Sequence, residues 1–415
     1  MFSEELFETA QSLSIDQNSL YHGNKADILR RFSKVSYPEI NPTVALIVEL
    51  SALLRIDFKC STFDDFAEKI YEHIIGVGKK YDRIDVICDR YFEESFKSDT
   101  RNSRGCGSEL SFDGQTAFPA DFKGNFLRNS RNKENLHIFL AVKLMGFHKN
   151  VKSFTVTKGD TILSNNYYLI DDASINNCSS EEADQKLVRH MIQCVKSGVK
   201  HVMIRTVDTD VLLLLISFRY DIGNYDSKVY AWFGVGKNKC FYDINSISLS
   251  QGSQVCQAIP FFHAFSGCDS TSSFFNQGKC KLWDKWNDFP LNKSLTEIFV
   301  ELSSKPINIT DDQINVLEKF ILFVYYPKLT DSFDLNIQRM HDFEFSTHNN
   351  LRLLPPSKNG LKEHVKRSSY VAGWISYQCL SNVSLPDPEQ WGWTKSNGQF
   401  YPKWQDIATP VDPIS

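Results

Sequence analysis

The chain has 415 residues, of which 42% are hydrophobic and 13% aromatic, and its formal net charge is −4. A chain of this length and composition can bury a large core, which excludes a disordered tail and a small stapled scaffold. The charge excludes nucleic-acid binding by bulk attraction alone, so any such binding has to come from a local basic patch.

The first third of the chain alternates apolar runs with helical periodicity. Residues 43–54 predict a strand that turns helical, and residues 62–81 predict a helix with Thr62 as its N-cap. A short β-branched strand is expected at residues 83–89. The polar stretch at residues 98–133, rich in Gly, Asn and Ser, predicts an inserted mobile basic loop.

The same alternation continues beyond this loop. We expect helices at residues 134–147, 179–198 and 258–272, and strands at residues 153–159, 166–171, 199–208, 227–234 and 240–244. Strands that alternate with helices favour an α/β fold with a mainly parallel central sheet covered by helices. From about residue 285 the pattern is mainly helical, and it ends in a tail rich in Trp and Pro whose tryptophans are expected to pack.

The cysteines and the apolar runs bear on the compartment. Ten cysteines are scattered without a CxxC pair, which argues against a structural zinc site and is typical of a reducing compartment. The start, "MFSEELFETAQSL", lacks the order of a signal peptide, and the longest apolar run, "VLLLLI", is too short to span a bilayer. We expect an intracellular protein, nuclear or cytoplasmic, without a membrane partner.

Carboxylates stand where several predicted strands end. Glu49 follows the first apolar run, Asp89 closes the next strand, and Asp208 and Asp210 follow a later one. In open parallel sheets, ligands bind outside the carboxyl ends of the strands, where the strand order reverses. Taken singly, each acid is more often a helix cap or a turn residue. Their shared position at one sheet edge is what favours a binding site.

Three further acids complete a set of seven: Glu182 and Asp184 in the first turn of a predicted helix, and Asp269 in the turn "FSGCDST". Neighbouring carboxylates disfavour one another's ionisation unless a cation compensates them. Magnesium prefers a few carboxylates plus water, and two such ions clamp the oxygens of a phosphodiester during hydrolysis. The set therefore predicts a metal site rather than seven unrelated caps.

Basic residues follow Asp89 at helical spacing. Lys97, Arg101 and Arg104 would project from one face, as phosphate contacts require, although a solvated basic face is the alternative. In a second stretch, basic residues alternate with Phe122 and Phe126. This pattern is typical of a surface that binds single-stranded nucleic acid, and it is equally compatible with an exposed loop. Its candidate nucleic-acid-binding residues are Lys123, Arg128, Arg131 and Lys133.

The ordered motifs "IVELSALL", "ICDRYFEESFKSDTR", "EEAD", "TVDTDVLLL" and "HAFSGCDSTS" resemble the PIN-like, flap-endonuclease (XPG-type) 5′-nuclease superfamily, and more closely metazoan PIN-like domain proteins. The resemblance runs from about residue 43 to 280. It implies a PIN-like three-layer fold at residues 43–285, between an N-terminal extension at 1–42 and a helical C-terminal region at 286–415.

The resemblance also implies divalent-metal-dependent hydrolysis of DNA or RNA, with two Mg²⁺ or Mn²⁺ ions and substrates of single-stranded or branched character. The metal ligands that it implies are Glu49, Asp89, Glu182, Asp184, Asp208, Asp210 and Asp269, and the phosphate-gripping residues are Lys97 with Arg101 or Arg104. Glu49 stands where Asp is usual and Asp184 where Glu is usual, and each exchange moves a carboxylate by one methylene. A binding module that does not cleave is therefore the alternative function. A DxD glycosyltransferase would leave the basic residues after Asp89 unexplained.

Overall fold

The computed structural model describes residues 9–39, 44–89, 107–147, 152–159, 161–166, 175, 183–223, 226–304, 308–328, 334–345, 350–380 and 386–405. The chain divides into two compact units. The unit called here the sheet unit comprises Ser33–Ser253 and Gln378–Val383. The unit called here the helical unit comprises Met1–Phe32, Gln254–Tyr377 and Ser384–Ser415.

Within the described part of the sheet unit, seven strands form one sheet in the order β4-β3-β2-β1-β5-β6-β7. The five central strands run parallel, and β4 and β7 pair antiparallel at the two edges. The strands are β1 (Val44–Glu49), β2 (Arg83–Ile87), β3 (Ser153–Lys158), β4 (Thr161–Ser164), β5 (His201–Thr206), β6 (Lys228–Phe233) and β7 (Cys240–Asp243). The chain builds outward from β1 in one direction and then in the other, so the strand order reverses between β1 and β5.

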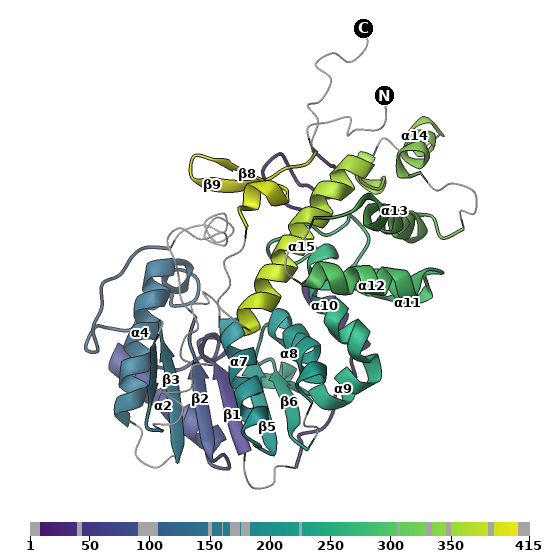
Figure 1. The fold of residues 1–415 in the computed structure, drawn as a ribbon. Coiled ribbons are helices and arrows are strands. Elements are labelled where there is room, and N and C mark those ends of the chain that lie inside the picture. Colours follow the sequence, from purple (N-terminus) through teal and green to yellow (C-terminus); the bar gives the residue numbers. More distant parts are fainter. Residues whose placement is uncertain are drawn as a thin grey trace. The chain divides into compact units, whose positions relative to one another are not determined.

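Helices cover both faces of this sheet and make three layers (Figure 1). One face packs against α2 (Phe63–Gly78) and α4 (Ser130–Phe147) around the main hydrophobic core. The other face is covered by α7 (Ala183–Lys196), α8 (Thr209–Ile222) and α9 (Ile244–Gln251). The described part of the unit also contains the short helices α1 (Leu50–Leu53), η2 (Phe126–Arg128) and η3 (Gly236–Asn238). The predicted fold class, a mainly parallel sheet covered by helices, is confirmed.

Local chemistry explains where these helices begin and end. Thr62 caps α2 by accepting a hydrogen bond from the Asp65 amide, as the sequence predicts. Asp208 caps α8 in the same way, so the two carboxylates of "DTD" lie at the start of a helix. After α7, Gly198 has φ +79°, which glycine tolerates and other residues avoid.

The region around the predicted loop differs from the prediction at its end. The helix α4 begins at Ser130 rather than near residue 134, because the Asn129 side chain accepts a hydrogen bond from the Asn132 amide and caps it. The short edge strand β4 was not predicted, and the strand predicted at residues 166–171 lies almost entirely outside the described residues.

The described part of the helical unit contains the helices α10 (Ser253–Phe265), α11 (Lys279–Asp288), α12 (Asn292–Ser303), α13 (Asp311–Tyr325), α14 (Leu335–Phe345) and α15 (Lys358–Leu380), with short turns η1 (Lys25–Arg31), η4 (Leu351–Leu353) and η5 (Pro388–Trp391). A hairpin of β8 (Trp393–Ser396) and β9 (Gln399–Pro402) follows η5. Trp391, Trp393 and Trp404 are buried, so the prediction that the tail tryptophans pack is confirmed. No described helix combines the length and apolar composition needed to cross a membrane.

His364 on α15 gives the helical unit a pH-dependent stability. Its side chain is 0% exposed, its Nε2 donates to the Phe265 carbonyl oxygen at 2.8 Å, and burial, with Arg367, lowers its pKa to about 3. An unfolded histidine titrates near pH ~6.5, so the unfolded chain takes up the proton first as the pH falls. The stability that the neutral, buried His364 contributes is therefore fully present above about pH 6.5, and it is lost as the pH falls toward about 3.

We expect this histidine to reduce the free energy of unfolding by up to about 1.4 kcal/mol per pH unit within that window. His364→Gln should flatten the slope, since glutamine does not titrate. Urea unfolding of both chains at a series of pH values measures the slope. Equal slopes in the two chains would contradict the assignment.

Candidate metal centre at the carboxyl edge of the sheet

The carboxylates predicted in the sheet unit follow the ends of three neighbouring parallel strands. Glu49 is the last residue of β1, Asp89 follows β2, and Asp208 follows β5. The strands are in register there, with Glu49 opposite Ile87 on β2 and Val48 opposite Arg205 on β5. This is the edge at which the strand order reverses, where open α/β sheets bind ligands.

Glu49 is a buried carboxyl, 6% exposed. Its Oε2 accepts a hydrogen bond from Thr206 Oγ1 at 2.6 Å and a longer one from the Val207 amide at 3.4 Å. Burial raises its pKa to about 8, and the nearby charges of Asp89 and Asp208 act in the same direction. Asp89 and Asp208 therefore both lie within electrostatic reach of Glu49, and their repulsion adds to the effect of burial on its pKa.

Asp89 is held from two directions. Its Oδ2 accepts a hydrogen bond from Ser51 Oγ at 2.5 Å, and its Oδ1 accepts one from the Ala183 amide at 2.9 Å. Residues of α1 and α7 therefore both bind the carboxylate. Burial alone would raise its pKa, but the neighbouring His137 and the two hydrogen bonds outweigh burial and lower that pKa. The same neighbourhood thus lowers the pKa of Asp89 and raises that of Glu49.

Asp208 and Asp210 lie at the start of α8. The Asp208 side chain accepts from the Asp210 amide at 2.9 Å, and its own amide donates to Thr206 Oγ1 at 3.0 Å. Asp210 is buried in the first helical turn. The hydroxyl of Thr206 thereby joins the end of β5 to both Glu49 and Asp208.

A buried ionic network joins β2 to α7, the helix whose first turn carries Asp184. Arg83 Nη2 and His190 Nδ1 contact Asp85 Oδ2 at 2.6 and 2.7 Å, and Arg83 also donates to Gln193. Burial would raise the pKa of Asp85, but Arg83 and His190 hold it well below its usual range. The network fixes α7 against β2, which brings the first turn of α7 next to Asp89.

Within the described ranges, no three His, Cys, Asp or Glu side chains stand together as ligands of one metal ion. Glu182 lies outside those ranges, as do Lys97, Arg101 and Arg104. The acids that act on Glu49 are the carboxylates of Asp89 and Asp208, and carboxylate oxygens are ligands that hard divalent cations prefer. Burial and the charges of Asp89 and Asp208 both raise the pKa of Glu49, and a bound cation would relieve the repulsive part of that effect.

Asp269, the seventh predicted ligand, belongs to the helical unit. It lies in the turn after α10, and its Oδ2 is 3.1 Å from Lys25 Nζ. Its role as a ligand stays a prediction.

The second basic stretch is only partly exposed. Phe122 and Phe126 are 8% and 3% exposed and stack on each other in the main core. Phe122 also packs against Phe66, and Phe126 against Phe63. They are therefore unavailable to stack on bases, contrary to the interpretation of the interleaved pattern. Arg128 is exposed, and Lys133 is partly buried on α4.

Two of the basic side chains already have acidic partners on the surface. Arg131 lies 3.5 Å from Glu109, and Lys123 Nζ lies 2.5 Å from Asp57 Oδ1 and 2.7 Å from the Arg55 carbonyl oxygen. Exposed pairs of this kind are held weakly, so a phosphate would compete for the cation.

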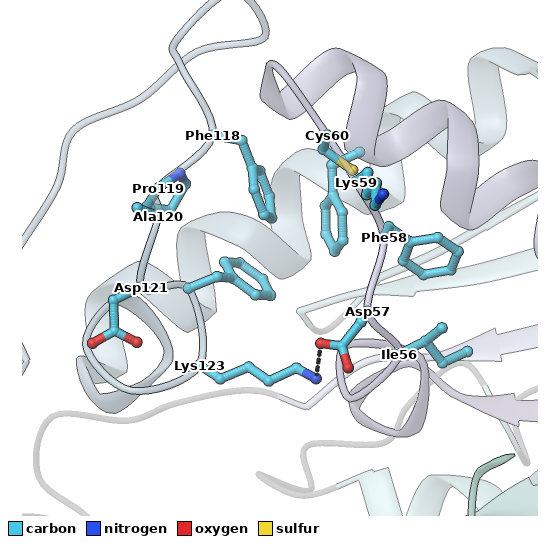
Figure 2. Close-up of a pocket in the computed structure, with 12 residues that line it drawn as sticks. Ile56, Asp57, Phe58, Lys59, Cys60, Phe118, Pro119, Ala120, Asp121 and Lys123 are labelled. Carbon is cyan, nitrogen blue, oxygen red and sulfur yellow. Dashed lines mark hydrogen bonds and ion pairs between the residues drawn. The ribbon is translucent and has the colours of Figure 1, made fainter.

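The Lys123–Asp57 pair closes one side of a pocket of ≈370 Å³ (Figure 2). Residues 56–60 and 118–123 form its walls, together with Phe66. Figure 2 shows Lys123 reaching across to Asp57 below the Phe118 ring. Charged side chains line the pocket at the Lys123–Asp57 pair, and the rings of Phe58, Phe66, Phe118 and Phe122 line it as well.

Sequence reasoning missed the side chains that hold the carboxylates. Ser51 and Thr206 lie two residues from Glu49 and Asp208, so their spacing was a usable signal. His137 on α4 and Lys186 on α7 also act on Asp89, and both are buried. Both residues come from segments far from Asp89 in the chain, so no local sequence pattern predicts that they lie near it.

No family model matches the sequence, and no curated protein matches it. A search of solved structures finds the T5 D15 protein co-crystallised with metal ions, at 12% identity and a TM-score of 0.36. The match covers 80% of this chain and 100% of that one. Similarity at this level says nothing by itself about activity. The fold class, an α/β architecture with a mainly parallel sheet and a helical region, is established by the strands and helices described above.

Proposed function

We propose that this protein is a divalent-metal-dependent nuclease that hydrolyses phosphodiester bonds of DNA or RNA. The observation that carries the proposal is Glu49, a buried carboxyl whose pKa is raised by burial and by the charges of Asp89 and Asp208. Such crowding at the carboxyl edge of a parallel sheet is costly unless a cation is bound there.

The residues that would hold Mg²⁺ or Mn²⁺ in the sheet unit are Glu49, Asp89, Glu182, Asp184, Asp208 and Asp210. Asp269 is proposed as a further ligand, in the helical unit. When two such ions are bound, they supply Lewis acidity toward the phosphate and the attacking water. Lys97 with Arg101 or Arg104 would bind the phosphate and offset its developing charge. Lys123, Arg128, Arg131 and Lys133 would attract the backbone of a single-stranded or branched substrate.

The protein's own side chains would orient these ligands. Thr206 donates to Glu49 and accepts from the Asp208 amide, and Ser51 fixes one oxygen of Asp89. These partners leave each carboxylate a limited set of orientations, which is how neighbours of metal ligands sharpen a site.

Thr206→Val tests this orienting role. The change keeps the shape of the side chain but removes both hydrogen bonds, so we expect metal-dependent cleavage to fall about 10- to 100-fold. Thr206→Ser keeps the hydroxyl and should retain most of the activity. The measurement is the initial cleavage rate of each variant at saturating Mn²⁺. Equal rates for the Val and Ser variants would contradict the role.

The test of the function is cleavage of labelled single-stranded, flap and hairpin DNA and RNA in Mg²⁺ or Mn²⁺. Wild type is compared with Asp208→Asn/Asp210→Asn, and we expect cleavage by wild type alone. Cleavage that survives in the double variant, or that needs no metal, would contradict the proposal.

A binding module that does not cleave is the second candidate. Two observations favour it. No three potential metal ligands stand together within the described ranges. Glu49 and Asp184 also replace the Asp and Glu that are usual at these two positions. Binding of the same substrates without cleavage, equal in wild type and double variant, is its expected result.

A further inference from the structure

The pocket of ≈370 Å³ lies wholly within the sheet unit, and the proposed carboxylate site does not use it. Its volume is within the ~300–1,000 Å³ range of small-molecule sites. Residues 56–60 and 118–123 form its two walls, and the hydrogen bond from the Phe118 amide to the Ser61 carbonyl oxygen joins them at 2.9 Å. The pocket is therefore built by one compact unit.

Two phenyl rings that line this pocket, those of Phe58 and Phe118, are only partly buried. The centroid of the Phe118 ring lies 4.8 Å from that of Phe66 and 4.7 Å from that of Phe122. The Phe58 ring meets the His73 ring in a T-shaped contact, with the centroids 5.9 Å apart. These contacts hold both rings in place without a ligand. A planar aromatic molecule can therefore stack in the pocket with little ordering cost.

The charged pair at one side of the pocket offers a donor and an acceptor next to each other. Lys123 Nζ lies 2.5 Å from Asp57 Oδ1 (Figure 2). The Lys123 and Asp57 side chains are 44% and 92% exposed, so water screens the pair and a ligand can open it at small cost. An exposed ion pair by itself indicates no ligand. Its position beside aromatic rings in a pocket is what favours one.

We propose that this pocket binds a guanine base. A ligand that uses both the rings and the charged pair is planar, and it presents an acceptor to the ammonium beside donors to the carboxylate. The Watson–Crick edge of guanine has this order, because O6 accepts from Lys123 while N1–H and N2–H₂ donate to the two oxygens of Asp57. Adenine carries an amino donor where guanine carries O6, so it would turn the wrong group toward the ammonium.

The guanine can belong to a free nucleotide or to an unpaired position of a nucleic-acid strand, and the base is the chemistry that the two share. Lys123 then contacts the base, a role more specific than attraction of the backbone. The inference does not rest on the proposed function, since binding of a base requires neither a metal ion nor cleavage. It can fail while the nuclease proposal stands, and it can hold for a chain that does not cleave.

The experiment is isothermal titration calorimetry of the full chain in EDTA, which excludes metal-dependent cleavage. The probes are guanosine, inosine and adenosine 5′-monophosphates, and two thymidine pentamers with a central guanine or adenine. We expect the guanine probe to bind about tenfold more tightly than the adenine probe, the discrimination usual for two good contacts to a base edge. Inosine monophosphate lacks the N2 amino group and should bind with intermediate affinity.

Two variants separate the contacts to the base edge from stacking. Asp57→Asn should bring the affinities for the guanine and adenine probes within about twofold of each other, because asparagine keeps only one acceptor oxygen. Phe118→Leu should weaken both probes alike, because it removes stacking surface and leaves the charged pair. Lys152→Met, which breaks the exposed Lys152–Asp82 pair of the same unit, is the matched control and should bind as wild type does. Circular dichroism confirms that each variant is folded.

The outcomes decide both the pocket and the source of the base. A guanine preference with the free nucleotides supports a nucleotide site, and one confined to the pentamers supports the pocket and assigns the base to a strand. Equal binding of guanine and adenine probes by wild type would refute recognition of guanine. A preference that survives in Asp57→Asn, or affinities unchanged in Phe118→Leu, would place the base outside the pocket. Absence of binding by every probe would overturn the inference and leave the sheet-edge metal site untouched.

Discussion

Replacing Asp208 and Asp210 together by asparagine is expected to reduce metal-dependent cleavage by about 10²- to 10³-fold, the loss usual when a group that stabilises transition-state charge is removed. Asparagine has nearly the volume of aspartate and caps a helix equally well, so the start of α8 should persist. The exchange removes two negative charges from the edge that also carries Glu49. The effect should therefore fall on cation binding and not on the fold.

The control for this variant is Asp226→Asn, an exposed aspartate of the sheet unit in the turn before β6. It loses a carboxylate of the same kind away from the sheet edge, and it should cleave as fast as wild type. Circular dichroism and urea unfolding of all three chains exclude a loss of structure. A double variant that is folded and cleaves within about threefold of wild type would contradict the roles of both residues.

Asp85→Asn is expected to lower the free energy of unfolding by about 3–5 kcal/mol, the cost of removing one partner of a buried ion pair. Asp85 is 0% exposed, and the Arg83 guanidinium would be left buried without its carboxylate. His190 on α7 would lose its partner as well. The first turn of α7 should then shift from the sheet edge, so the affinity for divalent ions should fall with the stability.

Two comparisons make this prediction specific. Lys152→Met breaks the exposed Lys152–Asp82 pair near the same strand and should cost less than about 1 kcal/mol. Arg83→Met/Asp85→Leu replaces the buried pair by apolar side chains and should recover much of the lost stability. Urea unfolding measures all of these. A cost for Asp85→Asn as small as that of Lys152→Met would contradict the buried network.

The elements that position the site could be predicted because their signals are local. The apolar run of β1 ends at Glu49, and the capping residues Thr62 and Asp208 mark where α2 and α8 begin. Once the strands are known to be parallel, their carboxyl ends necessarily share one edge, so the convergence of Glu49, Asp89 and Asp208 follows from topology.

Features that depend on distant contacts were not predictable. In "RIDVI", alternation places Asp85 on one face of β2, but only the contact with His190 on α7 shows that this face is buried. Phe122 and Phe126 resemble an exposed aromatic pattern in the sequence, but α2 supplies Phe66 and Phe63 as their packing partners. These pairings join residues that lie far apart in the chain, and no periodicity encodes them.

The hairpin of β8 and β9 has a local signal in the sequence. Asn397 and Gly398 both have positive φ, and an Asn-Gly pair between two short strands is a strong hairpin signal. The same tail carries Trp391, Trp393 and Trp404. Those side chains do pack, and Arg367 lies beneath them with its guanidinium 5.2 Å from the Trp404 ring.

The most direct test of the central claim is a crystal structure of the chain soaked in Mn²⁺, with anomalous diffraction recorded at the manganese edge. Manganese is visible in such a map independently of any assay, and both proposed ions would be located by it. We predict anomalous peaks in contact with the carboxylates of Glu49, Asp89 and Asp208, and no such peaks in Asp208→Asn/Asp210→Asn. A map without a peak at this sheet edge in the wild-type chain would contradict the assignment of a metal-dependent nuclease.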